Sequence, residues 1–68
     1  MAREFRFIGT TSDRNECPVL YELPGDRVAV QGELVTDPDE LAQMVKFGEA
    51  DAVVVVPREL LTRFAPKQ

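Results

Sequence analysis

Histidine and tryptophan are absent from this 68-residue chain, and cysteine occurs once, at Cys17. A nucleophilic serine or cysteine needs a neighbouring base, usually histidine, so the familiar hydrolase triads cannot form. One cysteine allows no internal disulfide and, without histidine, no zinc site. We therefore expect no catalytic, cofactor-binding or metal-binding residues. Cys17 is interpreted as a packed or idle thiol, or as one that pairs with a cysteine of another chain.

Long apolar segments are also lacking. The longest run, residues 52–56, is far too short to span a membrane, and residues 1–4 lead into no apolar core of a signal peptide. We expect a cytoplasmic, single-domain protein over residues 1–68, with an ordered core at 3–64 and a tail at 65–68. A chain of this size is marginally stable, so association with itself or with another protein is a natural supplement.

Positive charge is scarce in the middle of the chain, although composition is otherwise ordinary for a folded protein. The net charge is −4, which disfavours primary nucleic-acid binding. Residues 33–51 hold six acids and one base, Lys46, whereas residues 57–68 hold three bases and one acid. The acidic segment is either a solvated surface or a face for a basic partner, including a DNA-binding protein.

What the sequence does have is a run of four valines, Val53 to Val56, followed by proline. A continuous β-branched run without alternation predicts a central strand over residues 52–56, buried on both faces. Pro57 ends this strand and suits the start of a helix. In that helix Leu60, Leu61 and Phe64 share a face, which either closes the core or docks a partner.

Earlier in the chain, alternation of apolar and polar residues predicts three strands. The first covers residues 3–8 and ends at Gly9; the second and third, 19–23 and 27–31, form a hairpin around residues 24–26. Val19, Tyr21 and Leu23 are predicted to share the inner face. The polar residues 10–16 form a loop that either supports the fold or contacts a partner. Gly32 indicates a bulge or a close approach of another backbone.

A helix is predicted to begin at Asp37 as its N-cap, with Pro38 in the first turn and Glu40 completing a capping box. Its buried stripe is expected at residues 41, 44, 45 and 47, and Gly48 follows as its C-terminal cap. The order is β-β-β-α-β-α. We predict an α+β domain with one four-stranded, mostly antiparallel sheet and two short helices; parallel pairing of the last strand stays open.

Several of these segments, in this order, resemble the BldB-like family of small actinobacterial regulators. The shared pattern is Thr11-Ser12, Cys17, the strand at 27–30, the helix start at 36–39 and the strand-to-helix junction at 54–60. The family's tryptophan in the last helix is missing here. The resemblance implies an accessory protein without chemistry of its own that binds a helix-turn-helix transcription regulator.

A second resemblance is to the AbrB-like swapped-hairpin family. Residues 55–61 look like its V-I-P-x-E-L-R element and residues 23–30 like its K-P-G-D-x-V-x-V element, although in the reverse order. That resemblance implies a small DNA-binding or antitoxin-type dimer that uses Arg58, Arg63 and Lys67.

We therefore predict a non-enzymatic regulatory or accessory protein that binds another protein, with a homo-oligomeric structural module and the DNA-binding dimer as alternatives. Direct nucleic-acid or membrane binding is not expected. The predicted partner-binding residues are Asp37, Asp39, Glu40, Arg58, Leu61, Arg63 and Phe64.

Overall fold

The computed structural model describes residues 2–12 and 18–65, which fold into strands and two short helices. The elements are β1 (Arg6–Thr10), β2 (Val19–Leu23), β3 (Arg27–Gln31), β4 (Glu33–Leu34), α1 (Pro38–Leu41), β5 (Val54–Val55) and α2 (Arg58–Phe64). The α+β class, the element types and the two helices are confirmed. The single four-stranded sheet is wrong, because β1-β2-β3 form one antiparallel sheet and β4-β5 another. The interpretations of Cys17, of loop residues 13–16 and of Lys67 fall outside the described residues.

The β2–β3 hairpin forms where the sequence predicts it. Leu23 pairs with Arg27 across the turn, and the register continues to Val19 opposite Gln31. Gly25 and Asp26 both adopt positive φ, at 83° and 58°, a conformation that glycine and aspartate accept more readily than most residues. The turn chemistry and the alternation therefore agree, which is why this local prediction is confirmed.

Gly9 does not end the first strand, as the sequence suggested. The strand continues through it to Thr10, and the register with β2 shifts between Phe7 and Gly9. Glycine at this position is explained by α2, because a Cβ on Gly9 would meet the ring of Phe64 at 2.4 Å. The absence of a side chain thus lets the last helix lie directly on β1.

The core is small, and its two fully buried side chains lie between β2 and α2. Leu20 and Leu60 are fully buried, and Leu23 is nearly so. Successive side chains of a strand point to opposite faces, so Leu20 lies under α2 while Tyr21 and Leu23 face the other way. The predicted inner face of β2 is therefore correct for Leu23 alone; the deepest residue is Leu20 on the opposite face. We call β1, β2, β3 and α2 the body.

The valine run is not a buried central strand. Only Val54 and Val55 are in β5, both are exposed, and their partners are Leu34 and Glu33 in the two-residue strand β4. The pairing with β4 is antiparallel, which answers the question that the sequence left open. Among the residues that the structure describes, no layer packs on either side of this ribbon to bury it.

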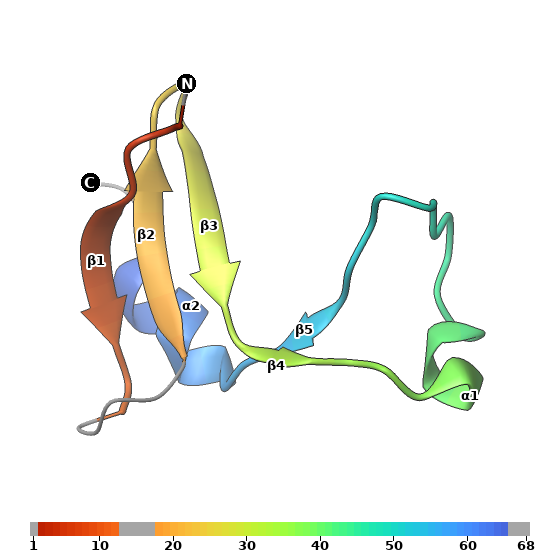
Figure 1. The fold of residues 1–68 in the computed structure, drawn as a ribbon. Helices are drawn as coiled ribbons and strands as arrows, with labels where there is room; N and C mark the ends of the chain where they lie inside the picture. The colour runs from red at the N-terminus through yellow and green to blue at the C-terminus, as the bar shows by residue number, and fades with distance from the viewer. Residues whose placement is uncertain (1, 13–17, 66–68) are drawn as a thin grey trace.

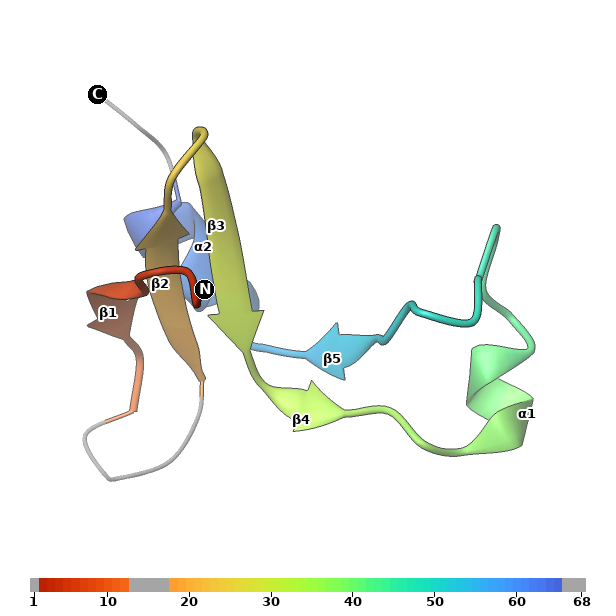
Figure 2. The ribbon, with the colours of Figure 1, turned by 45° about the horizontal axis from the view of Figure 1, so that its top comes forward.

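The second half of the chain extends away from the body, as Figures 1 and 2 both show. Residues 33–55, here called the arm, leave the end of β3, reach α1 at the far end and return through β5 to α2. The radius of gyration is 13.4 Å. A compact domain of this length has a radius near about 11 Å. The arm is therefore a projection from the body and adds nothing to its core.

Candidate protein-binding surface

The arm begins and ends at a narrow contact between Gly32 and the last valines. A Cβ on Gly32 would meet Val56 Cγ1 at 2.6 Å and the carbonyl oxygen of Val55 at 2.8 Å. The prediction of a close backbone approach at Gly32 is thus confirmed. Beyond it, the two chain segments run as an antiparallel ribbon, which the Val35 N–H extends by donating to the carbonyl of Val53 at 2.9 Å. This contact fixes where the arm leaves the body.

Helix α1 forms the far end of the arm, and it begins at the predicted N-cap, Asp37. The Asp37 carboxylate accepts a hydrogen bond from the backbone N–H of Asp39 at 2.9 Å, and Pro38 occupies the first helical position. The helix ends at Leu41, however, so the predicted stripe of Met44, Val45 and Phe47 is not a helical core face. An isolated turn of helix has too few hydrogen bonds to propagate without packing, and the described arm supplies none.

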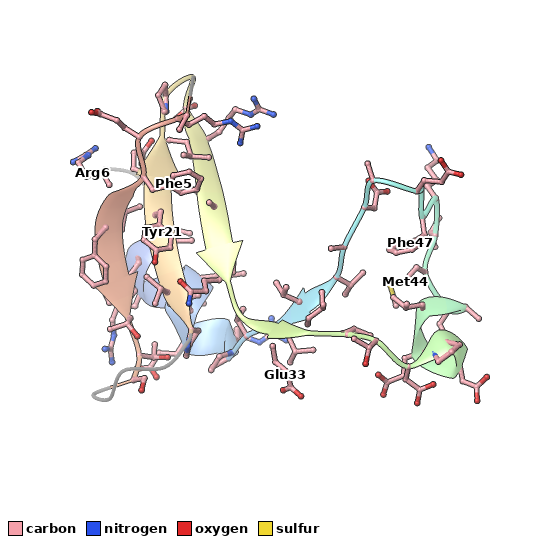
Figure 3. All side chains as sticks on the ribbon, in the orientation of Figure 1. Phe5, Arg6, Tyr21, Glu33, Met44 and Phe47 are labelled. Atoms are coloured by element: carbon pink, nitrogen blue, oxygen red, sulfur yellow. The ribbon has the colours of Figure 1, made fainter. Side chains whose placement is uncertain are left out.

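Apolar side chains that would normally form a core are instead exposed along the arm. Val45 is 86% exposed, Val55 56% and Leu34 55%. Met44, Phe47 and Val54 are exposed as well. Figure 3 shows Met44 and Phe47 pointing into the loop that the arm encloses, whereas Glu33 lies on the outer side of this loop, below β4. The arm therefore presents an apolar surface with carboxylates around it.

A second exposed apolar surface lies on the sheet face that α2 leaves uncovered, here called the open face. The rings of Phe5 and Tyr21 meet edge to face there, with centroids 5.8 Å apart (Figure 3). Phe7 pairs with Tyr21 across the strands, so its ring shares this face, and it is 60% exposed. The Tyr21 hydroxyl donates to the Gln31 side-chain oxygen at 2.8 Å.

The structure separates the predicted partner-binding residues into two groups. Asp37, Asp39 and Glu40 are exposed at α1, the end of the arm farthest from the body (Figure 1). The remaining four, Arg58, Leu61, Arg63 and Phe64, lie on α2. The seven residues therefore do not form one site, since the arm extends in between.

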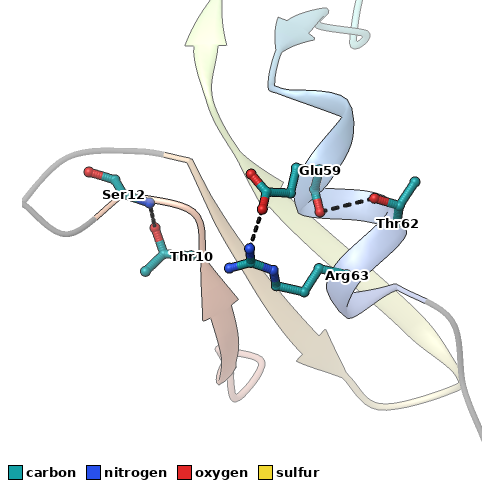
Figure 4. Close-up of polar contacts among 5 residues, drawn as sticks. All are labelled: Thr10, Ser12, Glu59, Thr62 and Arg63. Atoms are coloured by element: carbon teal, nitrogen blue, oxygen red, sulfur yellow. Dashed lines mark hydrogen bonds and ion pairs between the residues drawn. The ribbon is translucent and has the colours of Figure 1, made fainter.

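The apolar face of α2 was predicted either to close the core or to dock a partner, and its residues differ in how deeply they are buried. Leu60 is buried and closes the core, whereas Leu61 is 42% exposed. Phe64 is half-buried against Gly9. Figure 4 shows that Arg63 forms an ion pair with Glu59 one turn earlier. The DNA-binding alternative stays a prediction, but its Arg63 already has a carboxylate partner.

The loop between β1 and β2 is anchored on its first side by a short hydrogen-bonded turn. The Ser12 N–H donates to the Thr10 hydroxyl oxygen at 3.1 Å (Figure 4), and the Thr10 hydroxyl donates to the carbonyl of Pro18. Thr10 thereby links the two edges of the loop. This arrangement supports the interpretation of these polar residues as scaffolding at that point.

A hollow of about 390 Å³ lies at the turn end of the sheet. It is lined by three carboxylates, one guanidinium and the hairpin turn: Glu4, Glu22, Asp26, Arg6, Leu23, Pro24 and Gly25. Among the described residues, no cluster of three or more acidic or cysteine side chains could hold a metal ion. No described helix is long and apolar enough to cross a membrane.

Comparison with known proteins yields no match, whether to a protein-family model, to a curated protein or to a solved structure.

The sequence analysis missed the apolar arm surface and the open face as candidate sites. Both had a visible signal: the apolar residues at 41–47, the valine run and the alternating Phe5 and Phe7. The first two signals were assigned to the core of the same chain, and the third was used only to predict a strand. Hydrophobic patterning predicts that a residue is buried, but it does not say which molecule buries it.

Proposed function

We propose that this protein is a non-enzymatic regulatory or accessory protein that acts by binding another protein, and that the arm is its main contact surface. The observation that carries the proposal is the number of apolar side chains that the arm exposes, among them Leu34, Val45, Phe47 and Val55. By the strand register, Leu34 lies on one face of the ribbon and Val55 on the other. Exposed apolar surfaces usually mark interaction sites.

The charges around these side chains suit a protein partner with a basic surface. The exposed acids Asp37, Asp39 and Glu40 surround the start of α1. Carboxylates at the rim of an apolar patch favour association with a basic partner and select its orientation. The resemblance to BldB-like regulators suggests a helix-turn-helix transcription regulator as that partner.

The proposal is tested by capture with matched variants. The tagged wild-type chain, a V45K/F47K arm variant and a V28K variant are each used to capture proteins from the cells that make the protein. Val28 is 48% exposed on the edge strand β3, away from the arm, and lysine is well tolerated on edge strands. We expect the bound partner to be lost with V45K/F47K and kept with V28K. Identical capture by all three chains refutes the arm as the contact surface.

The contribution of charge is tested separately. Reversing the charge of Asp37, Asp39 and Glu40 together should slow association with a basic partner and make it less sensitive to salt. Association with the purified partner is followed at low and at physiological ionic strength. Unchanged rates at low salt mean that the acidic rim makes no contribution.

A further inference from the structure

We propose that the surface covering the arm is a second copy of this chain: the arm of each protomer packs on the open face of the other, forming a reciprocal homodimer. This inference rests on the proposed function: it keeps the arm as the contact surface and names a second copy of the chain, in place of a basic regulator, as the protein that covers it. It begins from a conflict between sequence and structure. The run Val53 to Val56 has the pattern of a strand buried on both faces, yet Val54 and Val55 are exposed in the single chain.

The amount of uncovered surface fits a permanent interface. The chain exposes 5899 Å². A compact monomer of its mass exposes about 4,300 Å², so roughly 1,600 Å² is surplus. A standard protein interface buries about 800 Å² per partner, and obligate homodimers bury more than about 1,000 Å² per chain. The surplus is therefore sufficient for an obligate dimer.

The arm needs a partner that is always present. Two-stranded ribbons are marginally stable in water without a third strand or a packed layer. The described part of the chain supplies neither to the arm, since β4 and β5 form a two-stranded sheet and α1 lies at the far end (Figure 2). Another copy of the same chain is available in equal amount wherever the protein is made. It can therefore stabilise the arm as part of folding.

Both surfaces needed for such an exchange are present on one chain. The arm offers Met44, Phe47 and the exposed valines, and the open face offers Phe5 and Phe7 (Figure 3). In a two-fold dimer, a contact between two different patches occurs twice, once in each direction. Reciprocal packing thus covers both apolar surfaces with a single symmetry operation.

Charge favours arm against body over arm against arm. Residues 33–51 hold six carboxylates and one lysine. The described residues of the sheet and its connections, 2–12 and 18–32, hold three arginines and three carboxylates: Arg3, Arg6 and Arg27 against Glu4, Glu22 and Asp26. Two arms side by side would place like charges together, which opposes association. An arm on the open face of the second copy instead brings an acidic segment to a part of the chain with no net charge.

The test is the mass of the full chain in solution, by light scattering on a sizing column from low to high micromolar concentration. The wild type and V28K should have twice the chain mass of 7.6 kDa. F47K and F7K should each raise the dimer dissociation constant by at least about 30-fold, as expected for loss of one apolar anchor. Both substituted residues are already exposed in the chain, so lysine there adds little cost to folding of the monomer.

Mixing the two variants distinguishes reciprocal packing from the other geometries. A dimer of one F47K chain and one F7K chain keeps one complete arm-to-face contact, whereas each variant alone keeps none. We therefore expect the mixture to regain dimers. If F7K alone remains dimeric, or if the mixture stays monomeric, arm-to-face packing is refuted.

Loss of folding is recognised by far-ultraviolet circular dichroism of each variant. If a variant unfolds, the decision passes to the wild type: nuclear Overhauser effects between labelled and unlabelled chains must connect the rings of Phe47 and Phe7. Their absence overturns the inference. A wild-type monomer whose captured partner is still lost with V45K/F47K also overturns it but leaves the proposed function intact. If neither the mass in solution nor the capture of a partner changes when the arm is substituted, both the dimer and the proposed function are refuted.

Discussion

The close contact between Gly9 and Phe64 predicts that G9A destabilises the body. A Cβ at position 9 would lie 2.4 Å from Cε1 of the Phe64 ring and 2.6 Å from Cδ1 and Cζ. Carbon atoms in contact prefer about 3.5–4.0 Å, so the ring must retreat by roughly 1 Å. Because Phe64 is half-buried, its ring can turn towards solvent, but it then loses its packing on β1.

Two opposing effects set the size of this change. Overpacking costs about 1–3 kcal/mol. Replacing glycine by alanine gains about 0.4–1 kcal/mol where the backbone tolerates it, because the unfolded chain loses freedom. We expect a net loss of about 1–2 kcal/mol in the free energy of unfolding. The urea midpoint should fall by roughly 1–2 M, since small chains have slopes near the low end of about 1–3 kcal/mol per molar.

The measurement is urea unfolding followed by circular dichroism, because the chain has no tryptophan to report by fluorescence. Protein concentration is held fixed, so that any association contributes equally. G48A is the matched control, because a Cβ on Gly48 has its nearest neighbour, Asp51 Oδ2, at 3.4 Å. It should change stability by less than about 0.5 kcal/mol or increase it slightly.

A double-mutant cycle identifies the cause. In an F64A background the ring is gone, so G9A should be neutral or stabilising by up to about 1 kcal/mol. The coupling between the two sites should then exceed about 1 kcal/mol, as for residues in direct contact. If G9A is neutral in the wild-type chain, or costs the same in both backgrounds, the close packing of α2 on β1 is refuted.

Two further substitution pairs test the helices. L60A should lower the free energy of unfolding by about 2–5 kcal/mol, whereas L61A on the same helix should lower it by less than about 1 kcal/mol, because of these two residues Leu60 alone is fully buried. Equal urea midpoints for the two variants would contradict the placement of α2. D37A should remove the N-cap of α1 and speed hydrogen exchange of the Asp39 amide about fivefold, for a cap worth about 1 kcal/mol, without changing exchange at Leu20. D37N keeps a capping side chain and should show little change; the opposite order would mean that the cap does not hold the helix.

Features that depend on residues close together in the chain were predicted correctly from the sequence. The hairpin at 24–26, the cap at Asp37 and the proline that precedes α2 depend on turn chemistry and backbone constraints within a few residues. These features do not depend on which elements pack together. They were therefore accessible without the structure.

Predictions that depended on packing were less successful. The apolar residues from Leu41 to Phe47 have helical spacing, yet α1 stops at Leu41 because nothing described lies against the stripe. The valine run has the composition of a central strand but pairs only with β4. Gly9 was taken as a strand end, since the sequence gives no sign that an aromatic ring from residue 64 will lie on it.

For the candidate site, too, local features could be predicted from the sequence and the arrangement in space could not. The acids near Asp37 were correctly placed at an exposed helix start, whereas Leu61 and Phe64 turned out to have different exposure and lie far from α1. Separation along the chain says little about separation in space once an arm intervenes. The apolar contact surface was hidden for a related reason, because its residues look like a core.

The contact at Gly32 has a consequence for how the chain tolerates change. Since Gly32 and Val56 touch, the arm is inserted into the body between two points that are already together. Doubling the length of such an inserted loop costs only about 0.6 kcal/mol in chain entropy. Changes of length beyond this point therefore cost the body little in chain entropy, as long as they spare the apolar residues of the arm that make its contacts. Position 32 should accept only a small residue, because a Cβ there would meet Val56 Cγ1 at 2.6 Å.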